Sequence, residues 1–298
     1  MQIIPVFIGI FRNGVKLLQL LIFLSNWRFI LMCSHKYLIF KLLIFLLIYS
    51  SGYAVSNKNS SVLIVFAMDS EANEINKIMS RKEEIVLKDY GINKKIIKGK
   101  ISNRNVISAV VGIGKVNMGL WTSYLLSKYN ISHIINCGVA GGVINPKMNK
   151  LKVGDIVVSS EVAYHDFDLV KFGHKVGQVP ELPQRFIADR NLLEKALKAI
   201  KTNLQDVNGY TGLILSGDQF IDSSYLAKIV ANFEDVVAVE MEGAAVGHVA
   251  HIFNVPFIVV RSISDIVNNE GNEFEYNEFL SLATLNAAKM VQEILRLL

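Results

Sequence analysis

Three carboxylates follow strand-like apolar runs at separate places in the chain, and side chains of this type can move protons. Glu71 opens a helical pattern after the first run, Glu242 follows a run and one methionine, and Asp265 lies just past another run. Taken singly, each acid is typical of a helix N-cap or a first helical turn. Together at one edge of a sheet, they would supply a general base, a hydroxyl anchor and a general acid. The set indicates a reaction in which water is deprotonated and a leaving group is protonated.

The elements that must position these acids are apolar runs rich in β-branched residues, with helical patterns between most of them. The runs predict strands at residues 62–66, 106–111, 133–137, 155–159, 212–215, 236–241 and 257–263. The helical patterns cover residues 70–79, 116–129, 191–203, 223–232, 242–253 and 276–298. Continuous apolar strands that alternate with helices predict an α/β fold with a largely parallel sheet covered on both faces. We expect one domain over residues 62–298, after a polar linker at 55–61.

Polar and glycine-rich segments cluster after the predicted strands, where open α/β sheets bind ligands. Residues 138–142 do not form the G-x-G-x-x-G pattern of dinucleotide sites, and Gly114-Lys115 is followed by valine, unlike a P-loop. These glycines indicate either tight strand-to-helix turns or close approach of the backbone to a ligand. We therefore expect neither a dinucleotide nor ATP, and no cofactor.

Two metal-like patterns have a simpler interpretation. His248 and His251 lie on a predicted helix without an acidic partner at metalloprotease spacing, so we expect them to be partly buried instead. The segment 164–168, which contains His165 and two aspartates, follows a strand and is expected to make loop hydrogen bonds. No G-x-S-x-G motif is present, so a serine nucleophile of the α/β-hydrolase type is not indicated. No metal site is expected.

The net charge of the chain is confined to its first 54 residues. Five of the 31 Lys and Arg residues, and none of the 26 Asp and Glu residues, lie there, so the rest of the chain is balanced. A balanced domain lacks the basic footprint of a nucleic-acid-binding protein, and no nucleic acid partner is expected. Cys137 is the only cysteine after residue 54, which leaves no intrachain disulfide once that leader is removed.

The leader at residues 1–54 has the order of a secretory signal. Lys36 and Lys41 precede an apolar core at 42–49, and small residues follow up to Ala54. The alternatives are an uncleaved membrane anchor and a start codon set too early, with Met32 as the true start. Export or anchoring places the protein in the cell envelope, with membrane association through the leader, whereas a misassigned start leaves it cytoplasmic. The leader has two apolar stretches, at 17–24 and 37–49, and neither reaches the roughly 20 uninterrupted residues of a membrane span.

Six segments, in order along the chain, resemble the 5′-methylthioadenosine/S-adenosylhomocysteine nucleosidases of the nucleoside phosphorylase superfamily. The matching segments are 67–71, 112–116, 151–159, 216–221, 238–242 and 261–265. The resemblance covers residues 62–298. It implies a three-layer α/β sandwich around a central twisted mixed sheet, a homodimer, and a nucleoside substrate. The implied activity is hydrolysis of the N-glycosidic bond of 5′-methylthioadenosine and S-adenosylhomocysteine, which releases adenine and the thioribose sugar.

The resemblance also implies the catalytic residues. Asp265 would protonate N7 of the adenine, and Ser264 would help to hold its side chain. Glu71 would activate the attacking water, with Arg261 nearby. To act as an acid near neutral pH, Asp265 needs an environment that raises its pKa.

The substrate contacts implied by the resemblance surround the ribose, the base and the alkylthio group. Glu242 and Met241 would hold the ribose, Phe220 would stack on the adenine, and the backbone of Ile221 would read its edge. Tyr276 would flank the site. The whole implied set is Met68, Ile113, Phe220, Ile221, Glu240, Met241, Glu242 and Tyr276, with Phe172 and Pro180 supplied by the partner subunit.

Two features depart from the family pattern. Val139 stands where many relatives carry a serine that helps to hold the water, and the apolar leader is not typical of the family. These departures leave two other hypotheses open. One is a nucleoside phosphorylase of the same fold, although Glu71 suits an activated water better than a phosphate anion. The other is a surface binding protein or adhesin that keeps the fold without catalysis.

Overall fold

The computed structural model describes residues 60–89, 92–146, 148–203 and 207–298. The leader at 1–54 lies outside these residues, so its interpretation as a signal peptide or anchor stays a prediction. Within the described ranges, no helix combines the length and the apolar character that a membrane span requires.

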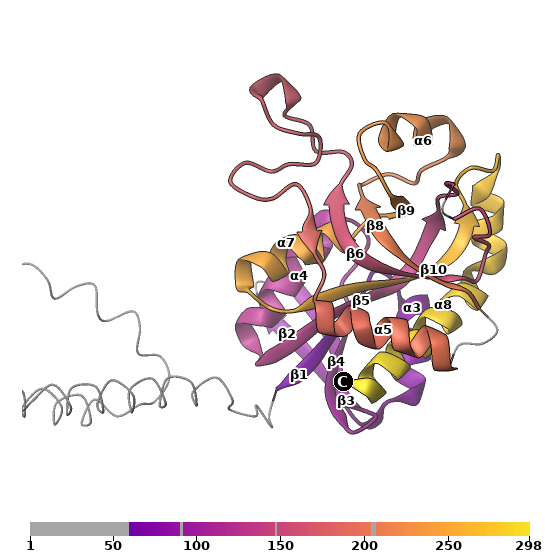
Figure 1. Cartoon of the computed structure of the whole chain (residues 1–298). Coiled ribbons are helices and arrows are strands. Elements are labelled where there is room, and N and C mark those ends of the chain that lie inside the picture. The colour runs from indigo at the N-terminus through magenta and orange to yellow at the C-terminus, as the bar shows by residue number, and fades with distance from the viewer. Residues whose placement is uncertain (1–59, 90–91, 147, 204–206) are drawn as a thin grey trace, which may run out of the picture. The chain divides into compact units, whose positions relative to one another are not determined.

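The strand β1 (Ser61–Phe66) shows how one apolar run builds two cores. It lies between two other strands of the sheet, and its side chains alternate between the two faces. Leu63 and Val65 pack with helices α4 (Lys115–Lys128) and α7 (Gly243–Phe253). The neighbouring side chains, Val62, Ile64 and Phe66, face the core that the helices on the other side cover. The result is the three-layer α/β sandwich that the family resemblance implies (Figure 1).

The remaining elements complete the sheet and its two covers. The strands are β2 (Ser80–Asp89), β3 (Ile92–Ile101), β4 (Arg104–Val110), β5 (Ile131–Gly142), β6 (Ile156–Tyr164), β7 (Phe186–Ile187), β8 (Gly209–Ser216), β9 (Val236–Glu240) and β10 (Phe257–Ile266). The helices are α3 (Asp69–Ile78), α5 (Arg190–Asn203), α6 (Ser223–Val230), α8 (Asn272–Leu297) and a 3-10 turn, η3 (Val170–Phe172). Helix α8 packs against α3 and α5 on the second face.

The sheet is mixed, and part of it closes on itself. Strands β4, β1, β5 and β10 pair in parallel, whereas β10 pairs with β6, and β5 with β9, in antiparallel fashion. Parallel pairs then join β6 to β8 and β8 to β9. Five of these pairings form a closed ring: β5 with β10, β10 with β6, β6 with β8, β8 with β9, and β9 with β5. The expectation of a largely parallel sheet is therefore too simple, and the mixed sheet implied by the resemblance is confirmed.

The glycine segment 138–142 lies inside β5 and forms no turn. Gly141 and Gly142 pair with β10 on one side and with β9 on the other. A Cβ on Gly142 would lie 2.7 Å from Leu151 Cδ2 and 3.0 Å from Ile263 Cγ2. The strand keeps glycine here because neighbouring strands and loops press on it from both faces, so the interpretation as strand-to-helix turns is wrong.

A register shift in β10 places the Asp265 side chain. Ile263 pairs with Ala140 and Asp265 with Gly141, so Ser264 is an extra residue between the two pairs. An extra residue of this kind bends a strand and redirects its side chains. The strand predicted to end at residue 263 continues to Ile266, and Asp265 lies within it.

The sequence patterns missed the hairpin of β2 and β3. Both strands are rich in charged residues, and of their described side chains only a few, such as Leu87 and Ile96, are buried. Charged residues, lysine above all, are a common way to protect the edge of a sheet from further pairing. Their polarity hides the strand signal. Helix α8 also begins four residues earlier than predicted, at Asn272.

Candidate active site

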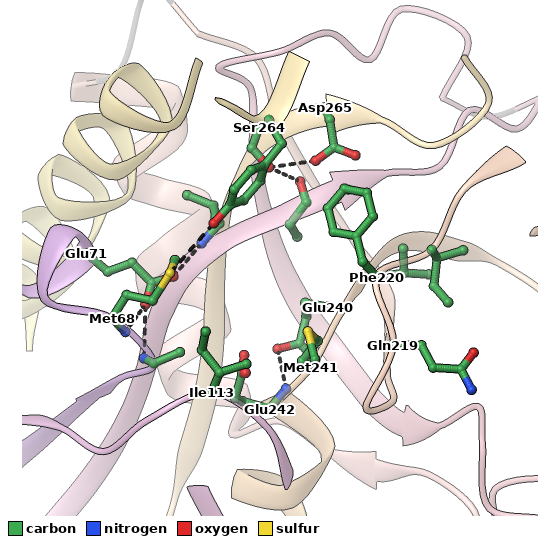
Figure 2. Close-up of a pocket in the computed structure, with 17 residues that line it drawn as sticks. Met68, Glu71, Ile113, Gln219, Phe220, Glu240, Met241, Glu242, Ser264 and Asp265 are labelled. Carbon is green, nitrogen blue, oxygen red and sulfur yellow. Dashed lines mark hydrogen bonds between the residues drawn. The ribbon is translucent and has the colours of Figure 1, made fainter. Parts of the chain in front are cut away.

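One pocket gathers the predicted substrate contacts, and it lies where β1, β5, β9 and β10 come together (Figure 2). Eleven predicted site residues line it: Met68, Glu71, Ile113, Phe220, Ile221, Glu240, Met241, Glu242, Ser264, Asp265 and Tyr276. Arg261 lies among the buried side chains next to the pocket and does not line it. Phe172 and Pro180 lie outside it, on the segment between β6 and β7, and both are exposed.

Glu71 is held at the start of α3 by backbone amides. Its Oε2 accepts hydrogen bonds from the N–H groups of Ala67 and Met68, at 2.9 and 3.0 Å, and its Oε1 accepts one from Val139 N–H at 3.2 Å. The bond to Met68, the residue that caps the helix, is one half of a capping box. Burial raises the pKa of Glu71, and the Arg261 charge and the three amides only partly offset this rise. A carboxylate with a raised pKa is a stronger base than an ordinary glutamate.

Val139 contributes a backbone donor to the site but no side-chain donor. Its N–H binds Glu71, while its apolar side chain lines the pocket. A Cβ on the preceding Gly138 would collide with Glu71 Oε1 and lie 2.8 Å from Arg261 Nη1. The absence of a side chain at Gly138 therefore lets the acid and the guanidinium come together over the strand.

Arg261 is a fully buried cation that is matched by acids. It hydrogen-bonds Glu240 and donates to Asn136 Oδ1 at 2.7 Å, and its Nη2 lies 3.7 Å from Glu242 Oε2. Burial alone would lower the pKa of Arg261, but the charges of Glu240, Glu242 and Glu71 outweigh it and the pKa rises. Arg261 therefore stays protonated.

Glu240 and Glu242 are two residues apart and differ in how their oxygens are used. Glu240 accepts hydrogen bonds from Ser216 Oγ, from Arg261, and from the N–H groups of Glu242 and Gly243 at the start of α7. Glu242 accepts one from Gly114 N–H at 2.9 Å. Burial, and then the neighbouring Glu240 charge, raise the pKa of Glu242 to about 8. Both oxygens of Glu240 accept hydrogen bonds from protein donors. Glu242 is therefore the acid that can still accept a hydrogen bond from a hydroxyl.

Asp265 is buried and held by two side-chain donors. Ser264 Oγ donates to its Oδ1 at 2.7 Å, and Asn272 Nδ2 donates to its Oδ2 at 2.6 Å. Both donors favour the charged form, but burial outweighs them and raises the pKa of Asp265. The structure thus agrees with the expectation that this carboxyl has a raised pKa.

Asn272 is a site residue that the sequence patterns missed. Its Nδ2 also donates to the carbonyl of Ile221 at 3.1 Å, so it joins Asp265 to the loop that carries Phe220. The helix was predicted to begin only at Tyr276, which left Asn272 in a loop. One signal in the sequence could have found Asn272: it lies seven residues after Asp265 and close to the start of a helical pattern.

Two aromatic rings flank the mouth of the pocket. Phe220 and Tyr276 meet edge to face, with ring centroids 5.8 Å apart, and Tyr276 Oη contacts Met68 Sδ at 3.6 Å. Phe220 is 51% exposed, which leaves one ring face free for a flat ligand. Burial, followed by the charges of Glu71, Asp265 and Glu242, raises the pKa of Tyr276. The pocket therefore carries a negative field and an aromatic wall.

The two histidine patterns have no metal-binding arrangement in the part of the chain that the structure describes. No group of three or more His, Cys, Asp or Glu side chains is placed to hold a metal ion there. His248 hydrogen-bonds Tyr164 Oη at 3.1 Å, whereas His251 is exposed. Asp166 makes the loop contacts expected of segment 164–168, since it binds Lys115 and the backbone of Asp218.

The chain is similar to known proteins over nearly all of its described residues. Residues 61–296 match the family model described as Phosphorylase superfamily, so the chain belongs to that superfamily. A 5′-methylthioadenosine/S-adenosylhomocysteine nucleosidase of an Exiguobacterium strain is 40% identical over 232 residues, which cover 78% of this chain and 95% of the relative. The Shewanella denitrificans enzyme of that name is 38% identical over 234 residues, 78% of this chain and 97% of the relative.

Solved structures give the same result. A candidate nucleosidase of this kind from Borrelia burgdorferi B31, bound to adenine, is 53% identical with a TM-score of 0.77 and covers 80% of this chain and 100% of that one. The Neisseria meningitidis nucleosidase, in complex with methylthio-immucillin-A, is 35% identical with a TM-score of 0.74 and the same coverage. Within the superfamily, the chain therefore belongs to the 5′-methylthioadenosine/S-adenosylhomocysteine nucleosidases, which are N-glycosidic hydrolases.

The burial of Asp265 predicts a pH-dependent stability cost. Because its folded pKa is raised, the folded protein keeps a proton that the unfolded chain releases above about pH 4. Stability therefore falls as pH rises from there through the folded pKa. Asp265→Asn removes this cost while keeping two partners, since its oxygen can accept from Asn272 and its amide can donate to Ser264. We expect equal melting temperatures near pH 4 and a more stable variant by pH 8, where each 1 kcal/mol adds about 2–4 °C. Melting curves between pH 4 and pH 8 measure this, and a gap that does not widen with pH contradicts it.

The Asn272 contact predicts a change in both rate and pH profile. Asn272→Ala removes a donor that favours ionised Asp265, so the pKa of Asp265 rises further. We expect the alkaline limb of the kcat/KM profile to move to higher pH, and kcat to fall about tenfold, as the loss of one hydrogen bond to a charged group implies. The profile of adenine release measures both, with Asn277→Ala on the exposed side of α8 as the control. An unmoved alkaline limb would show that Asn272 does not act on Asp265.

Proposed function

We propose that this chain hydrolyses the N-glycosidic bond of 5′-methylthioadenosine and S-adenosylhomocysteine. The observation that carries the proposal is a pair of buried carboxyls with raised pKa, Glu71 and Asp265, that line one pocket from different elements. Placed on different elements around one pocket, one carboxyl can act as a general base and the other as a general acid. The names of the similar enzymes supply the substrates, and the pocket offers each part of such a nucleoside a suitable neighbour.

The reaction follows from these positions. A water near Glu71 attacks C1′ of the ribose and gives a proton to the Glu71 carboxylate. The bond from C1′ to N9 breaks, and its electron pair leaves with the adenine, which takes a proton at N7 from Asp265. The ribose becomes cationic as the bond breaks, and the Glu71 carboxylate stabilises that charge until it takes the proton of the water. Adenine and the thioribose sugar, materials for methionine salvage, leave the site.

The occupied donors around Glu71 favour water over phosphate as the nucleophile. The three backbone N–H groups that could bind an anion already bind the Glu71 carboxylate. The only buried guanidinium next to the described pocket, Arg261, is matched by three acids. A phosphate dianion would meet a negative field in this pocket, so phosphorolysis is disfavoured.

Adenine release tests the proposed hydrolysis directly. With protein that starts at Val55, we expect release from 5′-methylthioadenosine in phosphate-free buffer, unchanged when phosphate is added. Glu71→Gln and Asp265→Asn should each lower kcat by about 10²–10⁴-fold, as expected on losing a general base or acid. Their circular dichroism should match the unsubstituted protein.

Two outcomes would contradict the proposal. A requirement for phosphate, with a sugar 1-phosphate among the products, would make the protein a phosphorylase. No release at all by folded protein, together with tight binding of adenine, would indicate a binding protein on the same fold.

We further propose that the active form is a homodimer in which each subunit completes the pocket of the other. The support is an apolar surface next to the pocket. On the segment between β6 and β7, which projects beyond the sheet in Figure 1, Val170 is 50% exposed and Phe172 78% exposed. On the adjoining helices, Val116 of α4 and Ile252 of α7 are 78% and 61% exposed. In the proposed dimer, the partner subunit's Phe172 and the partner subunit's Pro180 close the alkylthio end of the pocket.

Complementation between two defective subunits tests this arrangement. Glu71→Gln should be inactive alone, and Phe172→Ala should raise KM alone. In a mixed dimer, the subunit with intact Glu71 receives an intact Phe172 from its partner. We expect the mixed dimer, purified with two different tags, to recover up to about half of the unsubstituted kcat at normal KM. No recovery would show that Phe172 acts within its own subunit or not at all.

A further inference from the structure

Lys115, Asp166 and Asp218 form a charged cluster, here called the Lys115 cluster, beside the pocket. The three residues come from separate places: Lys115 begins α4, Asp166 follows β6, and Asp218 follows β8. Lys115 Nζ lies 2.5 Å from both carboxylate oxygens of Asp166 and 3.6 Å from Asp218 Oδ2. None of the three lines the pocket.

Backbone hydrogen bonds tie the same three segments together. Asp218 Oδ1 accepts from Lys115 N–H at 2.9 Å, and Asp166 Oδ2 accepts from Asp218 N–H at 2.9 Å. The side chains of Lys115 and Asp166 are 22% and 15% exposed, so the pair is shielded from water more than a surface ion pair is. Burial disfavours ionised Asp166, but the bonds from Lys115 and Asp218 outweigh it, and the pKa of Asp166 is lowered.

The Lys115 cluster joins two walls of the pocket from outside. On one side, Ile113 lines the pocket and Gly114 N–H binds Glu242 Oε1 at 2.9 Å, directly before Lys115. On the other side, Gln219, Phe220 and Ile221 line the pocket directly after Asp218. A Cβ on Gly114 would lie 3.1 Å from Asp218 Oδ1, so the two walls approach closely here.

The walls themselves have limited support within the chain. Ile113 and Phe220 are each 51% exposed, although both line the pocket. Phe220 would face the base, and Gly114 orients the acid that would face the ribose hydroxyls. The spacing between these two walls therefore decides whether base and ribose can be bound together.

We propose that Lys115 is a positioning residue for nucleoside binding, which holds the wall at 113–114 against the wall at 219–221 through Asp166 and Asp218. This inference rests on the proposed function and adds a determinant of substrate affinity to it. A preformed pocket loses less conformational freedom when it binds a ligand. Loss of Lys115 should therefore weaken binding, while the chemistry at Glu71 and Asp265, which Lys115 does not contact, continues.

The test compares Lys115→Met with Lys115→Arg. Lys115→Met keeps the aliphatic stem and removes the charge. We expect it to raise KM for 5′-methylthioadenosine and weaken adenine binding, each about tenfold or about 1.4 kcal/mol, with kcat within about threefold. Lys115→Arg should recover most of the affinity, since a guanidinium can still bind both aspartates. Lys77→Met, which breaks an exposed 2.5 Å pair with Glu74, is the matched control and should change neither quantity.

Several results would overturn the proposal. If folded Lys115→Met has a lower melting temperature but normal KM and adenine affinity, Lys115 has only a structural role. If KM rises for S-adenosylhomocysteine alone, Lys115 contacts the amino-acid part of that substrate and does not position the walls. Should Lys115→Met fail to fold, Asp218→Ala removes the acceptor of Lys115 N–H at a half-exposed position and should give the same loss of affinity; normal affinity there overturns the proposal.

Adenine binding by calorimetry separates this inference from the proposed function. A protein that releases no adenine from 5′-methylthioadenosine contradicts the proposed hydrolysis, yet its adenine affinity still reports on the two walls. Weaker adenine binding by Lys115→Met would then support the positioning role in a binding protein. Equal adenine affinity of Lys115→Met and the unsubstituted protein would overturn the positioning role.

Discussion

The burial of the Arg261 guanidinium is the constraint on which the rest of the site depends. A buried cation is costly unless acids and hydrogen-bond acceptors surround it. Glu240, Asn136 and Glu242 meet this need from β9, β5 and the start of α7. Because Glu240 also accepts the first N–H groups of α7, the same carboxylate fixes the direction of that helix. The electrostatic requirement of one side chain thus holds three elements in place around the pocket.

The glycines of β5 allow the charged groups to converge. At Gly138 a side chain would separate Glu71 from Arg261, and at Gly141 it would lie 3.1 Å from Asp265 Oδ2. The backbone of the strand therefore forms the floor between Glu71 and Asp265. Of the two explanations that the sequence left open for these glycines, close approach is the correct one. What approaches the backbone is first of all the protein's own charged side chains, Glu71, Arg261 and Asp265.

Sequence patterns located the acids because each follows a strongly apolar run of residues, and runs of that kind are recognisable from composition alone. They could not find Asn272, whose partner is defined by a register shift in β10. They could not assign the distant partners of Glu240 either, because Ser216 and Arg261 lie on other strands, β8 and β10. The β2–β3 hairpin was missed since its many charged residues resemble a solvated loop. Contacts between distant segments, and polar strands at an edge, are what local patterns leave undetermined.

The distribution of charge explains why this site suits cleavage that builds positive charge on a sugar. Glu71, Glu240 and Glu242 surround one guanidinium, and the fields of Glu71 and Glu242 reach the Tyr276 hydroxyl at the pocket mouth. A neutral nucleoside enters such a field without repulsion, and a cationic ribose is stabilised in it. An anionic nucleophile is repelled by this field, whereas a water that gives its proton to Glu71, as in the proposed reaction, brings no net charge. The acids that surround Arg261 in the fold therefore also select the nucleophile.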